Sequence, residues 1–160
     1  MKYYYIRPEA VGELGDRTIV DMRYHPEIVT RLHWLVDWWN GDVLVSLYPC
    51  RIVTEAASKE IELAKLTGVR FAEVAVGPSE EYCERHPETK LPRFKWMKIH
   101  GVQGQDDFGV DQPFEKTDQE QVFDPRGFTL VISQRALDLL QRLGISHAEI
   151  EEYSRPNPPL

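Results

Sequence analysis

The chain has only two cysteines among its 160 residues, Cys50 and Cys83, and they lie far apart. Two cysteines do not make the framework of several disulfides that holds small secreted domains together, and the count is ordinary for a reducing compartment. The N-terminal residues 1–8 lack the apolar core and small-residue cleavage site of a signal peptide. No apolar run approaches the roughly 20 residues that a membrane-spanning helix needs. These absences predict a cytoplasmic protein without a membrane partner.

Basic residues are also scarce, with 19 Lys and Arg against 26 Asp and Glu and a formal net charge of −7. Affinity for nucleic acid depends on clustered Lys and Arg, so we expect no nucleic-acid partner. An acidic surface keeps a protein soluble and speeds its encounter with a basic protein partner. The composition is globular, and the length suits one domain. We therefore expect a single domain over residues 1–153 and an extended, proline-rich tail over 154–160.

The clearest local signals begin at residue 51. A short strand at 51–53 leads to Thr54, a good helix N-cap, and a helix follows over 55–66. Gly68 ends this helix, and a strand is predicted over 69–76.

A second passage repeats this order near the C-terminus. A strand at 129–132 leads to Ser133 as N-cap, then to a helix over 134–143, Gly144 and a strand over 145–150. Both passages end in an Ala-Glu-apolar triplet, at 72–74 and 148–150. The repeat allows two interpretations, a duplicated strand–helix–strand unit or two uses of a common local pattern.

Other strands are predicted at 3–6, 28–39 and 94–100, together with a short acidic helix or turn over 79–87. The segment 28–39 could form a helix, but its alternating apolar residues and its β-branched and aromatic content favour a strand. A long loop over 101–126 is rich in Gly, Asp, Gln and Pro, as binding loops and disordered segments are. The pattern predicts an α+β fold in which two main helices pack on one mixed β-sheet.

An acidic pair in the long loop is the first candidate for chemistry. Asp106 and Asp107 could bind a divalent cation, but the segment lacks the ligand spacing of a calcium loop. We favour a solvated turn in which Phe108 inserts into the core and anchors the loop. The alternative is a small metal-dependent hydrolase that uses both aspartates with a helix-borne carboxylate, Glu55 or Glu81.

Cysteine and histidine form half of a zinc motif at Cys83-x-x-His86. No second pair follows, and Cys50 and His100 would have to be brought in by the fold. The flanking motifs of a cysteine nucleophile are missing as well. We therefore expect no metal, no cofactor and no enzymatic activity.

Tryptophan is frequent, with four residues in the chain. Adjacent residues of a strand point to opposite faces, so either Trp38 or Trp39 is expected near the surface, beside the turn at Asn40-Gly41-Asp42. Exposed tryptophan is common at the centres of protein interfaces.

Several of these segments together resemble the immunity proteins of bacterial polymorphic toxin systems, closest to the family numbered eleven. The resemblance covers most of the chain and is carried by residues 30–34, 37–44, 49–55, 66–71, 106–109, 131–137 and 147–153. A related group has paired Cys-x-x-Cys-Gly motifs, which this sequence lacks. The family's Trp- and Asp-containing motifs match Trp38, Gly41, Asp42, Asp106, Asp107, Phe108 and Gly109.

The resemblance implies a cytoplasmic α+β protein that binds and neutralises a cognate toxin made by the same cell. It implies no catalytic residues. We expect the partner-binding residues to include Trp38, Trp39, Asp42, Asp106, Asp107 and Phe108, with Trp39 and the loop 101–126 in the interface. A self-associating accessory protein, dimeric through a sheet edge or the tryptophan face, is a further alternative, and the sequence allows either a monomer or a homodimer.

Overall fold

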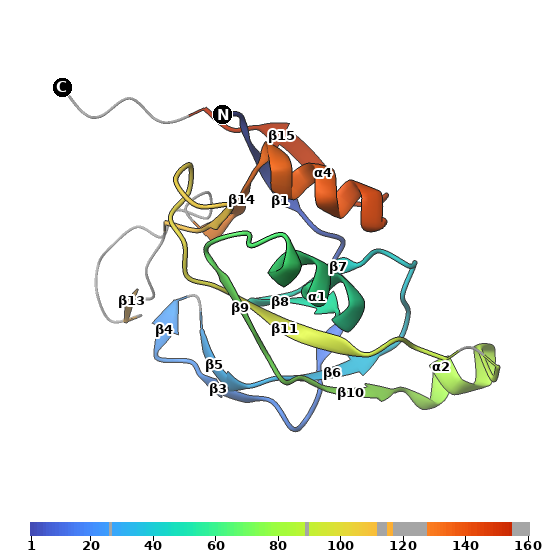
Figure 1. Ribbon diagram of the computed structural model, residues 1–160. Coiled ribbons are helices and arrows are strands. Elements are labelled where there is room, and N and C mark those ends of the chain that lie inside the picture. Colours follow the sequence, from blue (N-terminus) through green and yellow to red (C-terminus); the bar gives the residue numbers. More distant parts are fainter. Residues whose placement is uncertain (26, 89, 112–114, 117–127, 155–160) are drawn as a thin grey trace.

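The computed structural model describes the chain except residues 26, 89, 112–114, 117–127 and 155–160 (Figure 1). All of the predicted tail except its first residue, and much of the predicted loop 101–126, therefore lie outside the described residues. The described part has mostly antiparallel strands and three helices, which confirms the α+β class. None of its helices has the length and apolarity required to cross a membrane.

The single mixed sheet that the sequence predicts is replaced by several smaller sheets, because the chain repeatedly leaves one sheet for another. Two of them have four strands each, and each carries one helix (Figure 1). We call each of these two sheets, together with its helix, a half. The first half consists of β7 (Leu44–Leu47), β8 (Cys50–Thr54), α1 (Glu55–Leu63), β9 (Val69–Ala72) and β11 (Phe94–Ile99). The second half consists of β12 (Phe108–Gly109), β14 (Leu130–Ser133), α4 (Gln134–Leu143), β15 (Glu149–Glu152) and β1 (Tyr3–Arg7).

The two halves share one topology. Their strand orders are β7-β8-β11-β9 and β12-β14-β1-β15, so each strand–helix–strand unit is split by one antiparallel strand between its two strands. In the first half the inserted strand β11 follows the unit, whereas in the second half the inserted strand β1 comes from the N-terminus. The repeat suggested by the sequence therefore corresponds to equivalent topologies.

The strand registers show which residues are equivalent. Thr54 faces Phe94 across β8 and β11, as Ser133 faces Tyr3 across β14 and β1. Counting from these pairs, the position of Ile150, opposite Ile6, corresponds to that of Phe71, opposite Met97. The match of the triplets 72–74 and 148–150 was therefore wrong by three residues, because Phe71 and Ile150 lie equally far along the chain from their N-caps, whereas the matched triplets do not.

The structure confirms both predicted N-caps and the predicted bounds of one helix. The side chains of Thr54 and Ser133 accept hydrogen bonds from the backbone N–H groups of Ala57 and Ala136, as N-caps do. Helix α4 has its predicted bounds, whereas α1 ends at Leu63, three residues earlier than predicted.

The remaining strands form three small sheets, which lie mostly below the first half in Figure 1 and are called the lower layer. They are β2 (Glu13–Leu14), β3 (Ile19–Asp21), β4 (Tyr24–His25), β5 (Ile28–Arg31), β6 (His33–Val36), β10 (Ala75–Pro78) and β13 (Glu115–Lys116), and α2 (Glu80–Arg85) follows β10. The predicted strand 28–39 is broken into β5 and β6 and ends at Val36, and the predicted strand 69–76 is broken into β9 and β10, which lie in different sheets. The strand predicted over 145–150 begins later, at Glu149.

Two apolar clusters hold these layers together, one on each face of the sheet of the first half. Strand alternation places Val53 and Met97 in the cluster that also contains α1, α4 and the second half. Ile52 and Trp96 lie in the cluster on the opposite face, against the lower layer. The sheet of the first half is thus buried on both faces.

Gly68 is the last residue before β9 and Gly144 is the C-cap of α4, and both have positive φ, 87° and 123°. A Cβ atom at Gly68 would lie 2.0 Å from the carbonyl oxygen of Phe108, whereas one at Gly144 would meet no heavy atom within 4 Å. We predict that Gly144→Ala lowers the free energy of unfolding by about 1–2 kcal/mol, the cost of a left-handed backbone alone. Gly68→Ala should lower it by clearly more, because β12 must move. Equal losses in urea unfolding would contradict this close packing.

Candidate functional site

Asp107 is buried, and its carboxylate binds two segments that are distant from it in the sequence. Oδ1 accepts hydrogen bonds from Ser133 Oγ at 2.6 Å and Arg135 Nε at 2.8 Å. Oδ2 accepts from Arg135 Nη2 at 2.6 Å and from the backbone N–H of Thr67 at 2.9 Å. The side chain therefore joins the start of β12 to the N-terminus of α4 and to the turn after α1.

The same contacts determine the charge state of Asp107. Burial alone would raise its pKa, but the hydrogen bonds from Arg135, Ser133 and Thr67 outweigh that effect and lower the pKa to about 2. Asp107 is therefore a carboxylate at neutral pH, with its charge balanced by the guanidinium.

Asp42 is a second buried aspartate whose carboxylate connects distant segments. It is 1% exposed, and its oxygens accept hydrogen bonds from the backbone N–H groups of Ser146 at 3.0 Å and His147 at 2.9 Å. His147 Nδ1 lies 3.0 Å from Asp42 Oδ1. Burial raises the pKa of Asp42, but these hydrogen bonds lower it more, and the bond with Asp42 raises the pKa of His147.

These two aspartates connect the halves reciprocally. Asp107 lies in the second half and holds Thr67 of the first, whereas Asp42 precedes β7 of the first half and holds Ser146 and His147 of the second. Backbone hydrogen bonds accompany both contacts, from Phe108 N to Thr67 O at 3.1 Å and from Val43 N to Gly144 O at 3.0 Å. We call these two sets of contacts the Asp107 clasp and the Asp42 clasp.

The other residues of the acidic motif are also used by the fold. Phe108 is fully buried, as expected for a core anchor, while Asp106 is half-buried and accepts a hydrogen bond from Val102 N at 2.9 Å. The solvated turn favoured from the sequence is therefore wrong for Asp107. Asp42, Asp107 and Phe108 are all buried, so their side chains contact other parts of this chain.

The two tryptophans lie beyond the end of β6 rather than within a strand. Trp38 is 39% exposed. Trp39 is half-buried, donates from Nε1 to the backbone oxygen of Asp42 at 2.9 Å and packs edge-on against Phe94. Of the pair, Trp38 is the more exposed residue.

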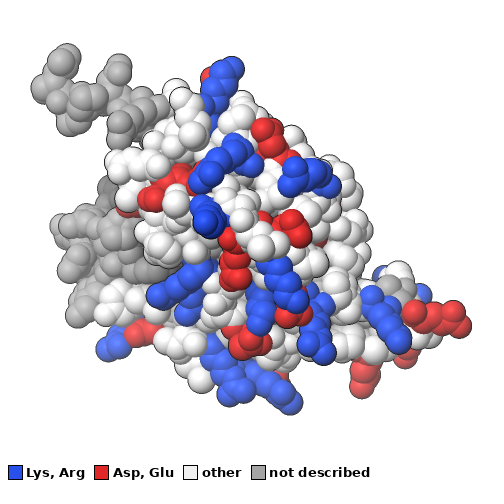
Figure 2. All heavy atoms as spheres, in the orientation of Figure 1, with Lys and Arg blue, Asp and Glu red and all other residues white. Residues whose placement is uncertain are grey.

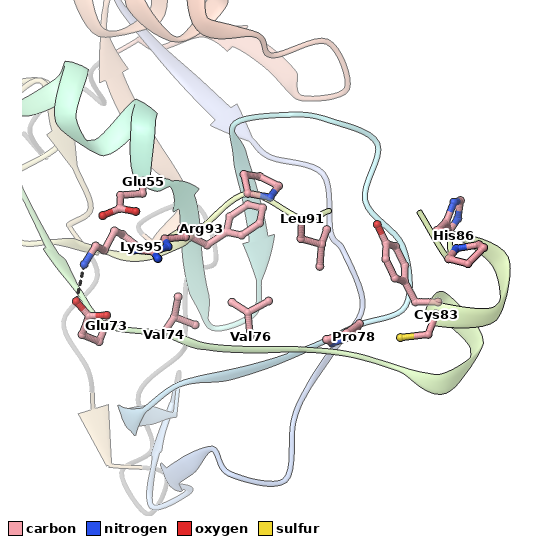
Figure 3. Close-up of a pocket in the computed structure, with 14 residues that line it drawn as sticks. Glu55, Glu73, Val74, Val76, Pro78, Cys83, His86, Leu91, Arg93 and Lys95 are labelled. Carbon is pink, nitrogen blue, oxygen red and sulfur yellow. Dashed lines mark hydrogen bonds and ion pairs between the residues drawn. The ribbon is translucent and has the colours of Figure 1, made fainter. Parts of the chain in front are cut away.

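A groove of about 660 Å³ lies where the first half meets the lower layer. It forms because β9 pairs with the later part of β11, after which the chain crosses to pair β10 with β6. The beginning of β11 and strand β10 are thus not paired with each other, and α2 follows at the far end (Figure 3). The lining residues are Glu55, Glu73, Val74, Val76, Pro78, Tyr82, Cys83, His86, Pro87, Leu91, Pro92, Arg93, Phe94 and Lys95.

The groove combines an apolar middle with polar ends. Val74, Val76 and Leu91 are half-buried and lie in its central part (Figure 3). At one end Lys95 forms an ion pair with Glu73, near Glu55 and Arg93. At the other end lie Cys83 of α2 and His86, the C-cap of that helix. Such a site can hold apolar side chains of a ligand whose polar groups reach the ends.

The residues proposed for catalysis or zinc binding are not gathered at one site, although Cys83 and His86 lie at the same end of the groove. Glu55 lines the groove, but Asp106 and Asp107 do not. Cys50 is buried, which raises the pKa of its thiol to about 12, whereas Cys83 is exposed. Within the described residues, one group of three or more side chains has metal-ligating atoms close together, and it contains Glu9, Asp42 and His147.

The sequence-based reasoning missed both the groove and this group. An apolar alternation at Val74 and Val76 was visible, but it was assigned to a single continuous strand. Glu9 and His147 gave no signal, because they are distant from Asp42 in the sequence.

No protein-family model, no curated protein and no solved structure matches the chain.

The Asp107 clasp generates a pH-dependent prediction. Because the pKa of Asp107 is lowered to about 2 in the folded protein, its contribution is complete above its usual pKa near 3.8 and is lost as the pH falls towards 2. We predict that Asp107→Asn lowers the free energy of unfolding by about 2 kcal/mol at pH 7 and by progressively less below pH 4.

Asp106→Asn is the matched control, because the amide oxygen can still accept the hydrogen bond from Val102 N. Its effect in the same urea titrations should be small at every pH. A loss for Asp107→Asn that is constant from pH 7 to pH 2.5 would show that the ionised carboxylate is not what stabilises the clasp.

Proposed function

We propose that this chain is an immunity-type protein that neutralises a cognate bacterial toxin by binding it directly, with the groove between β10, α2 and the start of β11 as the contact site. The observation that carries the proposal is the groove itself, which joins an apolar middle to charged ends. The resemblance to toxin-immunity proteins supplies the partner class.

The apolar middle supports recognition of a protein segment. Val74, Val76 and Leu91 are only half-buried in the free protein, so a partner side chain that enters the groove removes apolar surface from water. Each fully buried aliphatic side chain of the partner contributes roughly 1.5–3 kcal/mol.

The charged end supports orientation of that segment. Lys95 and Glu73 bind each other in the free protein, and Glu73 is largely exposed, so it can turn towards a basic residue of the partner. Over the face shown in Figure 2, acidic and basic residues are interspersed rather than separated into areas of one sign. The charged residues at the groove, rather than an excess of one charge sign over that face, would then set the orientation of the partner segment.

The tryptophans have different places in this proposal. Trp39 stands behind the groove, because its ring packs on Phe94, which lines it. It would support the groove wall instead of inserting into the toxin. Trp38 is exposed enough to touch a partner directly.

A pair of leucine variants tests the proposal. Leu91→Arg places a charged side chain in the groove, whereas Leu63→Arg makes the same change on α1, at a side chain that is 75% exposed and outside the groove. We predict that Leu91→Arg weakens the complex with the proposed toxin, taken as the product of the neighbouring gene, by at least about 30-fold. Leu63→Arg should leave the affinity within a few-fold of that of the unchanged protein.

The measurement is titration calorimetry with an inactivated toxin, together with rescue of growth on co-expression with the active one. Neither complex nor rescue with the unchanged chain would refute the proposed function. Full affinity and rescue by a folded Leu91→Arg variant would place the contact outside the groove.

A further inference from the structure

Three side chains from distant segments meet where the two halves join. Glu9 follows β1, Asp42 precedes β7 and His147 precedes β15. Each of the three side chains offers one potential ligand atom, and these three atoms lie within 4.8 Å of one another. Nδ1 is 3.0 Å from the Asp42 oxygen and 3.8 Å from the Glu9 oxygen.

The Glu9 carboxylate has an oxygen without a hydrogen bond. Its Oε1 accepts from Asn40 Nδ2 at 2.9 Å, but Oε2 is buried and has no hydrogen-bond partner. A buried carboxylate oxygen in this condition costs free energy unless a cation stands close to it. The unsatisfied atom is the one that points into the cluster.

The two clasps differ in their positive charge. Asp107 faces the permanently charged guanidinium of Arg135 at 2.6 Å. At the Asp42 clasp two carboxylates face one imidazole, which carries a charge only when it is protonated. The second clasp thus lacks the permanent cation that balances the first.

We propose that Glu9, Asp42 and His147 form a binding site for a divalent transition-metal ion such as Zn²⁺ or Mn²⁺. Two carboxylate oxygens and one imidazole nitrogen are a donor set for such ions. Bonds of about 2.0–2.2 Å to a tetrahedral ion separate the ligand atoms by about 3.3–3.6 Å, a range between the two observed distances from Nδ1, 3.0 Å and 3.8 Å. The ion takes the place of the proton between His147 and Asp42.

The surroundings of the site fit this role. Ser146 and the backbone of His147 hold the Asp42 carboxylate, and Asn40 holds that of Glu9, as outer partners fix metal ligands. The His147 side chain is 43% exposed, which provides a path for the ion and a place for a water ligand. None of the three ligands lines the groove, so the inference is independent of the proposed function.

The test compares tag-free, chelator-treated full-length protein with its Glu9→Gln variant. Calorimetry and thermal unfolding at pH 8, where protons compete least, are carried out with ZnCl₂ and with MnCl₂. Glu9→Gln removes one ligand oxygen but leaves the Asp42–His147 hydrogen bond in place. We expect at least one of the ions to raise the melting temperature of the unchanged chain, and we expect the variant to bind that ion at least about tenfold more weakly.

His100→Gln, at an exposed histidine outside the cluster, is the control and should bind the ion like the unchanged protein. Absence of uptake of either ion by the unchanged protein would overturn the proposal, and the cluster would then be an ion pair of His147 with the two carboxylates. Equal affinity of the unchanged protein and of folded Glu9→Gln would overturn it as well, because the ion would be bound elsewhere.

Discussion

The contact of Asp107 with Arg135 and Thr67 is the interaction on which the arrangement of the two halves depends. A carboxylate that is removed from water must keep its partners, and those of Asp107 come from both halves. If the halves separated, the carboxylate would lose the Thr67 N–H group and Phe108 would leave the core. Asp42 imposes the same condition from the opposite side, so neither half can move alone.

This coupling also positions the groove. Strand β11 belongs to the first half and is held in its sheet by β8 and β9, while β10 is drawn to β6 of the lower layer. The groove is the space between the beginning of β11, which remains in the sheet of the first half, and β10, which pairs with β6 of the lower layer. Its rear wall is linked to the Asp42 clasp, because Trp39 binds the backbone of Asp42 and packs on Phe94. A displacement of Asp42 would therefore shift Trp39 and, through the contact of the two rings, Phe94 in the groove wall.

Local patterns predicted the local structure of this chain. Thr54 and Ser133 were identified as caps because a hydroxyl at the start of a helix accepts a hydrogen bond from a free backbone N–H group of the first turn. The bounds of α4 were predicted to the residue. The two long strands were predicted wrongly, since alternation shows which face a side chain takes but not the sheet to which each part of a strand belongs. The α+β class was therefore predictable from the sequence, and the division into several sheets was not.

The candidate sites were less predictable, because they depend on contacts between distant residues. Asp42 and Asp107 stand in segments that look like polar turns, and only the folding of one half against the other buries them. Only a comparison of the two halves shows that the two clasps differ in their charged side chains. One clasp includes an arginine, whereas the other places a second carboxylate, Glu9, beside a histidine. The proposed divalent ion would correct this difference in charge balance between the two clasps, because it would satisfy both carboxylates of the second clasp at once.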